Sequence, residues 1–215
     1  MFETNTYRHL LEELDHKAVL VAVSKMHSVE DIRCAYDLGQ RIFAENKAAE
    51  LAAKAEVLPK DIEWHYIGHL QRNKVRTVLP YVSMIQSLDS MRLAQEIEKE
   101  AAKIGKVIPC LLEFHLARED ANKTGMNEEE GMELLKSCAA FPHIRICGMM
   151  AMGPHTDDAE KIYAVFQKGS ELFRRLQKLD PKLNILSMGM SDDYPLAVKA
   201  GANMVRIGSR LFKGD

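Results

Sequence analysis

The sequence of 215 residues lacks long apolar runs, an excess of one charge sign and compositionally biased segments. No apolar run approaches the roughly 20 residues that span a bilayer, and segment 1–17 is acidic and amphipathic rather than of the signal-peptide type. Neither charge sign is in excess, because 29 basic residues face 31 acidic ones. We therefore expect neither a membrane nor a nucleic acid as partner. No biased segment occurs, which excludes disordered and fibrous classes.

Cysteine is scarce and forms no CxxC pair. The four cysteines are Cys34, Cys110, Cys138 and Cys147. Three of them lie in apolar periodic segments, which is typical of reduced thiols in a cytosolic protein. The sequence also has no GxSxG motif, and the pair His65 and His69 lacks the glutamate of a zinc-protease motif. We expect no metal site.

What the chain does have is a regular alternation of short apolar runs and helical patterns. The runs are residues 18–24, 41–45, 63–68, 83–87, 109–115, 144–152, 184–189 and 203–208. They are continuously apolar, which is typical of parallel strands that are covered on both faces. Helices with readable ends lie between them. Ser28, Asn127 and Thr156 are predicted as N-caps, and Gly39, Gly105 and Gly201 as helix ends.

Eight strand–helix units without a linker predict an α/β protein, a closed (β/α)8 barrel formed by residues 1–215 as one domain, with an extra helix over residues 3–15. The alternative is an open, doubly wound sheet. No GxGxxG follows any of the runs, which disfavours a dinucleotide-binding sheet of that kind.

Polar residues follow the predicted strands, where a barrel of this type places its active groups. Lys25 follows the first strand, Asn46 the second, and the segments "SMGMS" (187–191) and "RIGS" (206–209) end the last two. Phosphate sites of such barrels often lie after strands seven and eight. We expect these two segments to bind a phosphate through their glycines, through the hydroxyls of Ser191 and Ser209, and through amides at helix starts. A plain N-cap role for Ser191 is the alternative.

Lys25 follows the apolar run "AVLVAV" (18–23) of the first strand after one residue, Ser24. A lysine that is partly withdrawn from water has a lowered pKa, and its neutral amine attacks aldehydes. A phosphate site and such a lysine on one rim fit pyridoxal 5′-phosphate (PLP), and they equally fit an aldolase that acts on phosphorylated sugars. We expect Met188 and Met190 to offer packing faces for a flat cofactor.

Several stretches resemble the pyridoxal phosphate homeostasis protein family, also called the proline synthase co-transcribed family. These stretches are "VAVSK" (21–25), "FAEN" (43–46), "WHYIGHLQRNKV" (64–75), "SLDS" (87–90), "KTGM" (123–126), "GMMAM" (148–152) and "LSMGMSDDYPLAVKAGANMVRIGSRLF" (186–212). They span nearly the whole chain in the order that the family shows.

The resemblance implies a barrel like the N-terminal domain of alanine racemase, with the aldehyde of PLP held by Lys25 as a Schiff base. It implies phosphate contacts from Ser191, Gly208 and Ser209, a role for Arg206 near the ring or the phosphate, and Asn46 in the wall of the site. Departures from the family pattern are Ala44 in place of a glycine, His27 in place of a second lysine, "EFHLA" on the fifth strand, and "LFKGD" at 211–215.

The resemblance implies a non-catalytic protein that takes part in PLP (vitamin B6) homeostasis and amino-acid and keto-acid balance, in the cytoplasm, as a monomer with PLP-dependent apo-enzymes as partners. The alternative is a PLP-dependent racemase-like enzyme. Racemisation needs a base on each face of the substrate carbanion. In the similar racemases a tyrosine from a second domain supplies one base, and we expect no such domain after the eighth strand.

Overall fold

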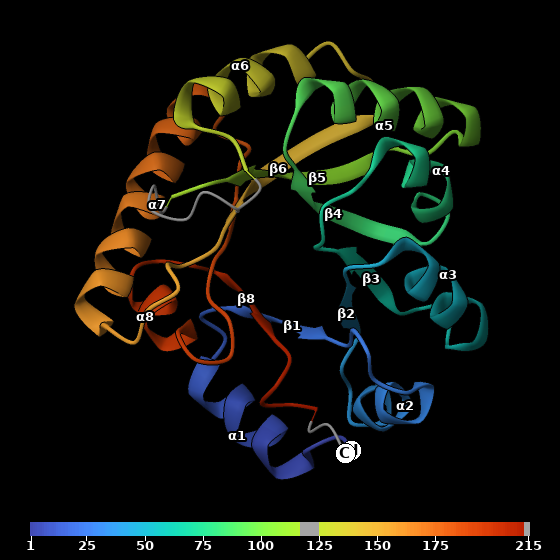
Figure 1. Ribbon diagram of the computed structural model, residues 1–215, viewed down its shortest axis with the longest axis vertical. Helices are drawn as coiled ribbons and strands as arrows, with labels where there is room; N and C mark the ends of the chain where they lie inside the picture. The colour runs from blue at the N-terminus through green and yellow to red at the C-terminus, as the bar shows by residue number, and fades with distance from the viewer. Residues whose placement is uncertain (117–124, 213–215) are drawn as a thin grey trace.

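The computed structural model describes residues 1–116 and 125–212. Within these residues, eight strands close into a barrel in the order of the sequence (Figure 1). Every strand pairs in parallel with its neighbours, and β8 closes the barrel onto β1 through pairs such as Ala22 with Ile207. The prediction of a closed (β/α)8 barrel is therefore confirmed, and the open sheet is excluded.

The strands agree with the predicted runs to within one or two residues at almost every end. They are β1 (Val19–Val23), β2 (Ile42–Glu45), β3 (Glu63–Tyr66), β4 (Val82–Leu88), β5 (Ile108–Phe114), β6 (Ile144–Ala151), β7 (Ile185–Ser187) and β8 (Met204–Ile207). The helical segments are α1 (Thr4–Leu14), α2 (Val29–Asp37), α3 (Ala48–Val57), the 3-10 turn η1 (Arg72–Lys74), α4 (Val75–Val78), α5 (Met91–Ile104), α6 (Glu128–Cys138), α7 (Ala159–Leu179) and α8 (Tyr194–Lys199).

The helix ends follow from local chemistry, with one correction. Ser28 caps α2 by accepting a hydrogen bond from the Asp31 amide, and Asn127 forms a capping box with Glu130 at α6. For α7, the predicted cap Thr156 is wrong. The N-cap is Asp158, whose carboxylate accepts from the amides of residues 160 and 161. The side chain of Thr156 instead accepts from the Asp158 amide, two residues further along the chain, so it supports the N-cap residue.

The eighth position of the helical ring is filled by α1. The sequence predicted eight strand–helix units, but in the described residues β8 is followed by a turn at 209–211. Figure 1 shows α1 between α8 and α2, in the position where a helix after β8 would lie. Contacts fix it there: the Tyr7 hydroxyl donates to Gln40, and the Tyr194 hydroxyl of α8 donates to Glu13.

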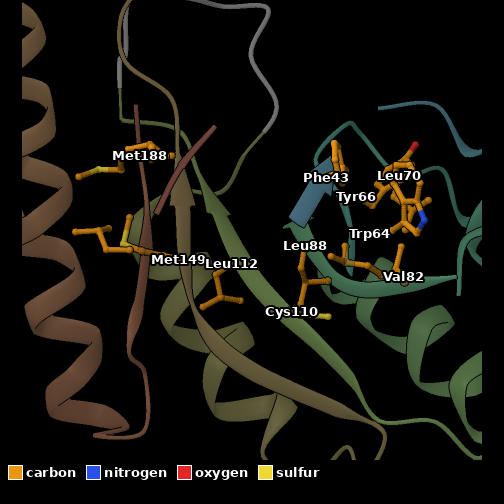
Figure 2. Close-up of a cluster of buried hydrophobic side chains, with 14 of the residues drawn as sticks. Phe43, Trp64, Tyr66, Leu70, Val82, Leu88, Cys110, Leu112, Met149 and Met188 are labelled. Atoms are coloured by element: carbon orange, nitrogen blue, oxygen red, sulfur yellow. The ribbon is translucent and has the colours of Figure 1, made fainter. Parts of the chain in front are cut away.

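Two core layers cover the faces of the strands. The larger layer packs the outer face against the helices, and Figure 2 shows part of it, including Phe43, Trp64 and Tyr66. The smaller layer fills the barrel in two apolar groups. One contains Val21, Val23, Ala44 and Met204, and the other contains Met84, Leu111 and Met150. None of the described helices is long and apolar enough to cross a membrane.

Candidate functional site

The carboxyl ends of the strands form the rim on which the predicted site residues lie. Lys25 lies in a turn two positions beyond Val23, the last residue of β1, whose side chain belongs to the inner layer. Lys25 itself is exposed. Sequence reasoning expected a partly desolvated amine, and the structure gives no such burial, because the residue follows the last residue of β1 at the open mouth of the barrel.

The two glycine-bearing segments lie side by side. The amide of Arg206 donates to the carbonyl of Gly189 at 3.0 Å, and the amide of Gly208 donates to Ser191 Oγ at 3.3 Å. Gly189 has a φ of +94°, and a Cβ there would lie 2.7 Å from the Ala197 Cβ. Only glycine fits this turn without strain. The structure therefore brings together the segments that the sequence predicted as one phosphate cradle.

The same segments adjoin the strand that carries Lys25. A Cβ on Gly208 would lie 3.3 Å from both the Cβ and the carbonyl oxygen of Val23. The backbone after β8 thus approaches the end of β1 closely, two residues before Lys25. This contact places the lysine and the glycine-bearing segments on one side of the rim.

Two local details differ from the sequence-based interpretation. The N-cap position of α8 is Asp193, so Ser191 is not the cap, and its buried hydroxyl is available to the Gly208 amide. Ser209 is exposed and begins a turn rather than a helix. The expected helix-start amides are therefore absent after β8 in the described chain, where residues 209–211 form a turn.

Asn46 supplies an unpartnered polar atom at the rim. Its Oδ1 is buried and has no hydrogen-bond partner among the described residues. The backbone of Asn46 is fixed by the Tyr66 hydroxyl, which donates to the Asn46 carbonyl at 3.1 Å, and by Gly68, where a Cβ would meet that same carbonyl oxygen at 2.4 Å. A buried acceptor without a partner costs free energy unless a ligand or water satisfies it.

Arg206 lies inside the barrel rather than on the open rim. Its Nη1 donates to the carbonyl and hydroxyl oxygens of Ser187, at 2.9 and 2.7 Å, and its Nη2 donates to the Ala151 carbonyl at 3.1 Å. Burial lowers the pKa of this guanidinium to about 10, against the opposing influence of Asp193 and Glu113. The arginine ties β8 to β7 and β6 below the two glycine-bearing segments.

A buried ionic cluster that the sequence did not predict holds the turn around Lys25. Lys54 of α3 donates to the Ser24 carbonyl at 2.7 Å, to Glu45 at 2.7 Å and to Glu50 at 2.8 Å. Ser24 Oγ also donates to Glu45 at 2.7 Å. On the other side of Lys25, the Met26 amide donates to Glu50 at 2.6 Å, and Met26 has a φ of +64°. This cluster fixes the backbone on both sides of the lysine.

The electrostatics of the cluster follow from its burial. Burial raises the pKa of Glu45, although hydrogen bonds from Lys54 and Ser24 oppose the rise. Burial would also raise the pKa of Glu50, but hydrogen bonds from Lys54 and the Met26 amide outweigh it and leave that pKa lowered. The spacing of Glu50 and Lys54, four residues apart in an alanine-rich helix, was the available sequence signal.

The remaining residues that the sequence analysis singled out have different outcomes. Met188 is fully buried and points toward α7 (Figure 2), so it offers no face to the rim. Met190 is 42% exposed. His27, one of the departures from the family pattern, stacks on Phe212 with ring centroids 4.8 Å apart. Residues 123 and 124 of "KTGM" and residues 213–215 of "LFKGD" lie outside the described residues.

The fold and its rim define a class of (β/α)8-barrel proteins with a lysine beside paired glycine-bearing turns. The family model described as "Alanine racemase, N-terminal domain" matches residues 4–215. The chain belongs to this family and, within it, to the pyridoxal phosphate homeostasis proteins.

Curated relatives of that name support the assignment over almost the whole chain. The pyridoxal phosphate homeostasis protein of Helicobacter pylori is 40% identical over 201 residues, which cover 92% of this chain and 88% of the relative. The protein of that name from Schizosaccharomyces pombe is 34% identical over 200 residues, which cover 90% of this chain and 83% of the relative.

Solved structures give the same picture. PipY of Synechococcus elongatus PCC7942 without PLP superposes with a TM-score of 0.91 at 36% identity, covering 97% of this chain and 98% of PipY. Its structure with PLP bound gives 0.89 at 34%, with the same coverage. The alanine racemase of Clostridium difficile 630 has a TM-score of 0.82 at 16% identity, over 99% of this chain and 57% of the racemase, and shows the shared fold alone.

Proposed function

We propose that this chain binds PLP without catalysing a reaction on it and takes part in PLP homeostasis and in amino-acid and keto-acid balance. The observation that carries the proposal is the approach of Gly208 to Val23, which sets the paired turns of β7 and β8 beside the strand end bearing Lys25. PipY, 34% identical over 97% of this chain, has a structure with PLP bound, which supports the same assignment.

The residues on the rim fit the chemistry of PLP. When bound, PLP supplies a phosphate and an aldehyde that reacts with a primary amine. Lys25 is an exposed primary amine on a turn that is fixed by the cluster around Lys54. The hydroxyls of Ser191 and Ser209 are donors for the phosphate, and the amide of Gly208, which donates to Ser191 Oγ, orients the first of them. Asn46 lines the site with its unpartnered oxygen, and Arg206 lies beneath the turns.

The first experiment tests the amine. Wild type, Lys25→Met and the matched control Lys47→Met are loaded with PLP, and their visible absorbance is recorded. Lys47 is an exposed lysine that follows β2 on the same rim. We expect the protein-bound chromophore to be lost only in Lys25→Met. Borohydride reduction and peptide mass spectrometry then locate the adduct, and an adduct on any other lysine contradicts the assignment.

The second experiment tests the phosphate donors. Each of Ser191→Ala and Ser209→Ala removes one hydroxyl bond to a charged group, worth about 1–3 kcal/mol, or roughly fivefold to 100-fold in affinity. We expect weaker retention of PLP and an unchanged affinity for pyridoxal, which has the same ring and aldehyde but no phosphate. Equal losses for both ligands, or no loss in the double variant, would rule out a phosphate role.

The third experiment separates binding from catalysis. The PLP-loaded protein is incubated in deuterated water with individual amino acids, and exchange at the α-carbon is followed by NMR. We expect exchange no faster than with free PLP and a model amine, because the proposal assigns no second base on the opposite face. Exchange at enzymatic rates would instead establish the racemase-like activity.

The same proposal describes the protein as a cytoplasmic monomer that passes PLP to apo-enzymes. The shared name of the curated relatives supports the homeostatic part of this statement. Native mass spectrometry of the purified protein gives the subunit count and the bound adduct in one measurement. Activation of a PLP-dependent apo-enzyme by the loaded protein, compared with an equal concentration of free PLP, tests the transfer.

A further inference from the structure

The amino-terminal mouth of the barrel, on the face opposite the rim of Lys25, contains a cavity of about 660 Å³. Its walls come from the beginnings of β3 to β7 and from the segments that lead from α6 into β6 and from α7 into β7. A volume of this size suits a small-molecule ligand. The mixed lining includes the apolar side chains of Met84, Leu135 and Ile146.

One polar side chain of the lining is nearly completely buried and has a free atom. His65 is 3% exposed, and its Nδ1 lies 2.8 Å from Gln86 Nε2. Among the described residues, its Nε2 has no hydrogen-bond partner. This nitrogen is not one of the buried atoms that lack a partner, so it is reached from the cavity that His65 lines, and water or a ligand in the cavity is its partner.

A chain of hydrogen bonds decides which nitrogen of His65 carries the proton. The guanidinium of Arg206 can only donate hydrogen bonds, so Ser187 Oγ accepts from it at 2.7 Å. The Ser187 hydroxyl in turn donates a hydrogen bond to Gln86 Oε1, also at 2.7 Å. The amide nitrogen of Gln86 then donates to His65 Nδ1. Nδ1 is thereby an acceptor, and the proton of the neutral ring lies on Nε2. Burial lowers the pKa of His65 to about 4, which agrees with a neutral ring.

The cavity thus holds an N–H donor at the end of a chain that begins at a buried cation, and such chains polarise each successive bond. Two cationic side chains, Arg145 and Lys182, also line it, and neither forms an ion pair within the described part of the chain. The carboxylates of Glu63 and Asp180 balance them in net charge. The Asp180 carboxylate already accepts the Lys182 amide at 3.0 Å. Because His65 is buried whereas Arg145 and Lys182 are exposed, we assign the head group of a ligand to the donor of His65 rather than to the two cations.

We infer that this cavity is a second ligand site, which takes a small carboxylate with an apolar body, its head group on His65 Nε2 and its charge offset by Arg145 and Lys182. An anionic acceptor makes the strongest bond to such a donor. The inference concerns the face of the barrel away from Lys25, and it stands whether or not PLP binds at the other end.

The first test reads the proton position directly. In wild-type protein without PLP, the ¹⁵N imidazole spectrum of His65 should show protonated Nε2 and unprotonated Nδ1. Titration with 3-methylbutanoate should move the Nε2 signal in a saturable way, and 3-methylbutanamide, the uncharged isostere, should bind at least several-fold more weakly. A proton on Nδ1, an unmoved signal, or equal binding of the amide would each overturn the inference.

The second test uses variants. Arg145→Ala and Lys182→Ala change exposed side chains and should each weaken 3-methylbutanoate binding roughly twofold to fivefold. His65→Leu should weaken it about tenfold or more. Lys168→Ala, an exposed lysine on α7 outside the cavity, is the matched control and should bind as wild type does. If His65→Leu does not fold, Arg145→Ala and Lys182→Ala decide the question. Binding of 3-methylbutanoate that neither of these two variants weakens would overturn the site.

Discussion

At the scale of single residues, we expect Lys54 to contribute strongly to the stability of the folded protein. Its side chain is 7% exposed and that of its partner Glu45 is fully buried, so removing the cation leaves a buried carboxylate without its counter-ion and takes one donor from the Ser24 carbonyl. We expect Lys54→Met to lower the free energy of unfolding by about 3–5 kcal/mol, measured by urea denaturation. It should also weaken PLP binding, because the turn around Lys25 loosens.

The control for this prediction is the double variant Lys54→Met with Glu45→Gln. Neutralising Glu45 removes the unpaired charge, so part of the lost stability should return. A double variant that is as unstable as the sum of the two single variants would show that the residues do not act as a pair.

His65 gives a prediction about pH. Its pKa in the folded protein is about 4, below the ordinary value of 6.5. Between these two values the unfolded chain binds more protons than the folded one, so the free energy of unfolding falls as the pH falls from 6.5 toward 4. The expected loss is about 3 kcal/mol, and above pH 6.5 this contribution is constant.

The measurement is a series of urea titrations between pH 4.5 and 7.5 on wild type and His65→Gln. The variant keeps a polar partner for Gln86 but has no proton to gain, so the difference between the two curves isolates His65. Parallel curves across that range would contradict a neutral histidine in the folded state.

Residue by residue, the sequence was informative where a role follows from position along the chain. Lys25, Asn46 and the two glycine-bearing segments were identifiable because they follow apolar runs, and parallel strands of a barrel end on one rim. Lys54, Gln86 and Ser187 were not, because their roles depend on neighbours distant in the sequence. Even for Lys25 only the position was predictable and not the exposure, since exposure depends on how open the rim is.

At the scale of elements, the strands were predictable because each is a short, mostly apolar run that lies between two helical patterns. The helix starts were less predictable where several capping residues lie close together. In the segment "HTDDAE" (155–160), Thr156, Asp157 and Asp158 are all suitable caps. Only the path of the chain into α7 selects Asp158, whose Oδ1 receives two amides.

This selection can be tested on α7. Asp158→Ala removes the acceptor of those two amides, and we expect it to lower the free energy of unfolding by about 1 kcal/mol. Thr156→Ala, the matched variant at the cap that the sequence predicted, should cost clearly less, because Thr156 accepts only the Asp158 amide. Chemical denaturation of both variants compares the costs, and a larger loss in Thr156→Ala would restore the original prediction.

At the scale of the whole molecule, closure of the barrel was predictable from eight strand-forming runs, but closure of the helical ring was not. The sequence showed an extra helix before the first strand without indicating where it packs. In the structure this helix covers the junction of β8 and β1, since Glu3 donates its amide to the Leu211 carbonyl at 2.8 Å and Phe2 forms a β-bridge with Phe212. The ring is thus joined by the two ends of the described chain.

Phe212 is the centre of this junction and the subject of the last prediction. It is 2% exposed and lies 5.2 Å from the ring of Phe2 and 4.8 Å from that of His27. Phe212→Ala should cost about 3–5 kcal/mol, as for other buried aromatic residues. Because the contact joins α1 to the barrel, hydrogen exchange should accelerate first in α1 and β1 and least in β5 and β6, on the far side. Leu179→Ala, at a 47% exposed position, is the control and should leave exchange unchanged. Uniform acceleration over all strands in Phe212→Ala would contradict this prediction, because it would mean that α1 and the barrel unfold together as one unit.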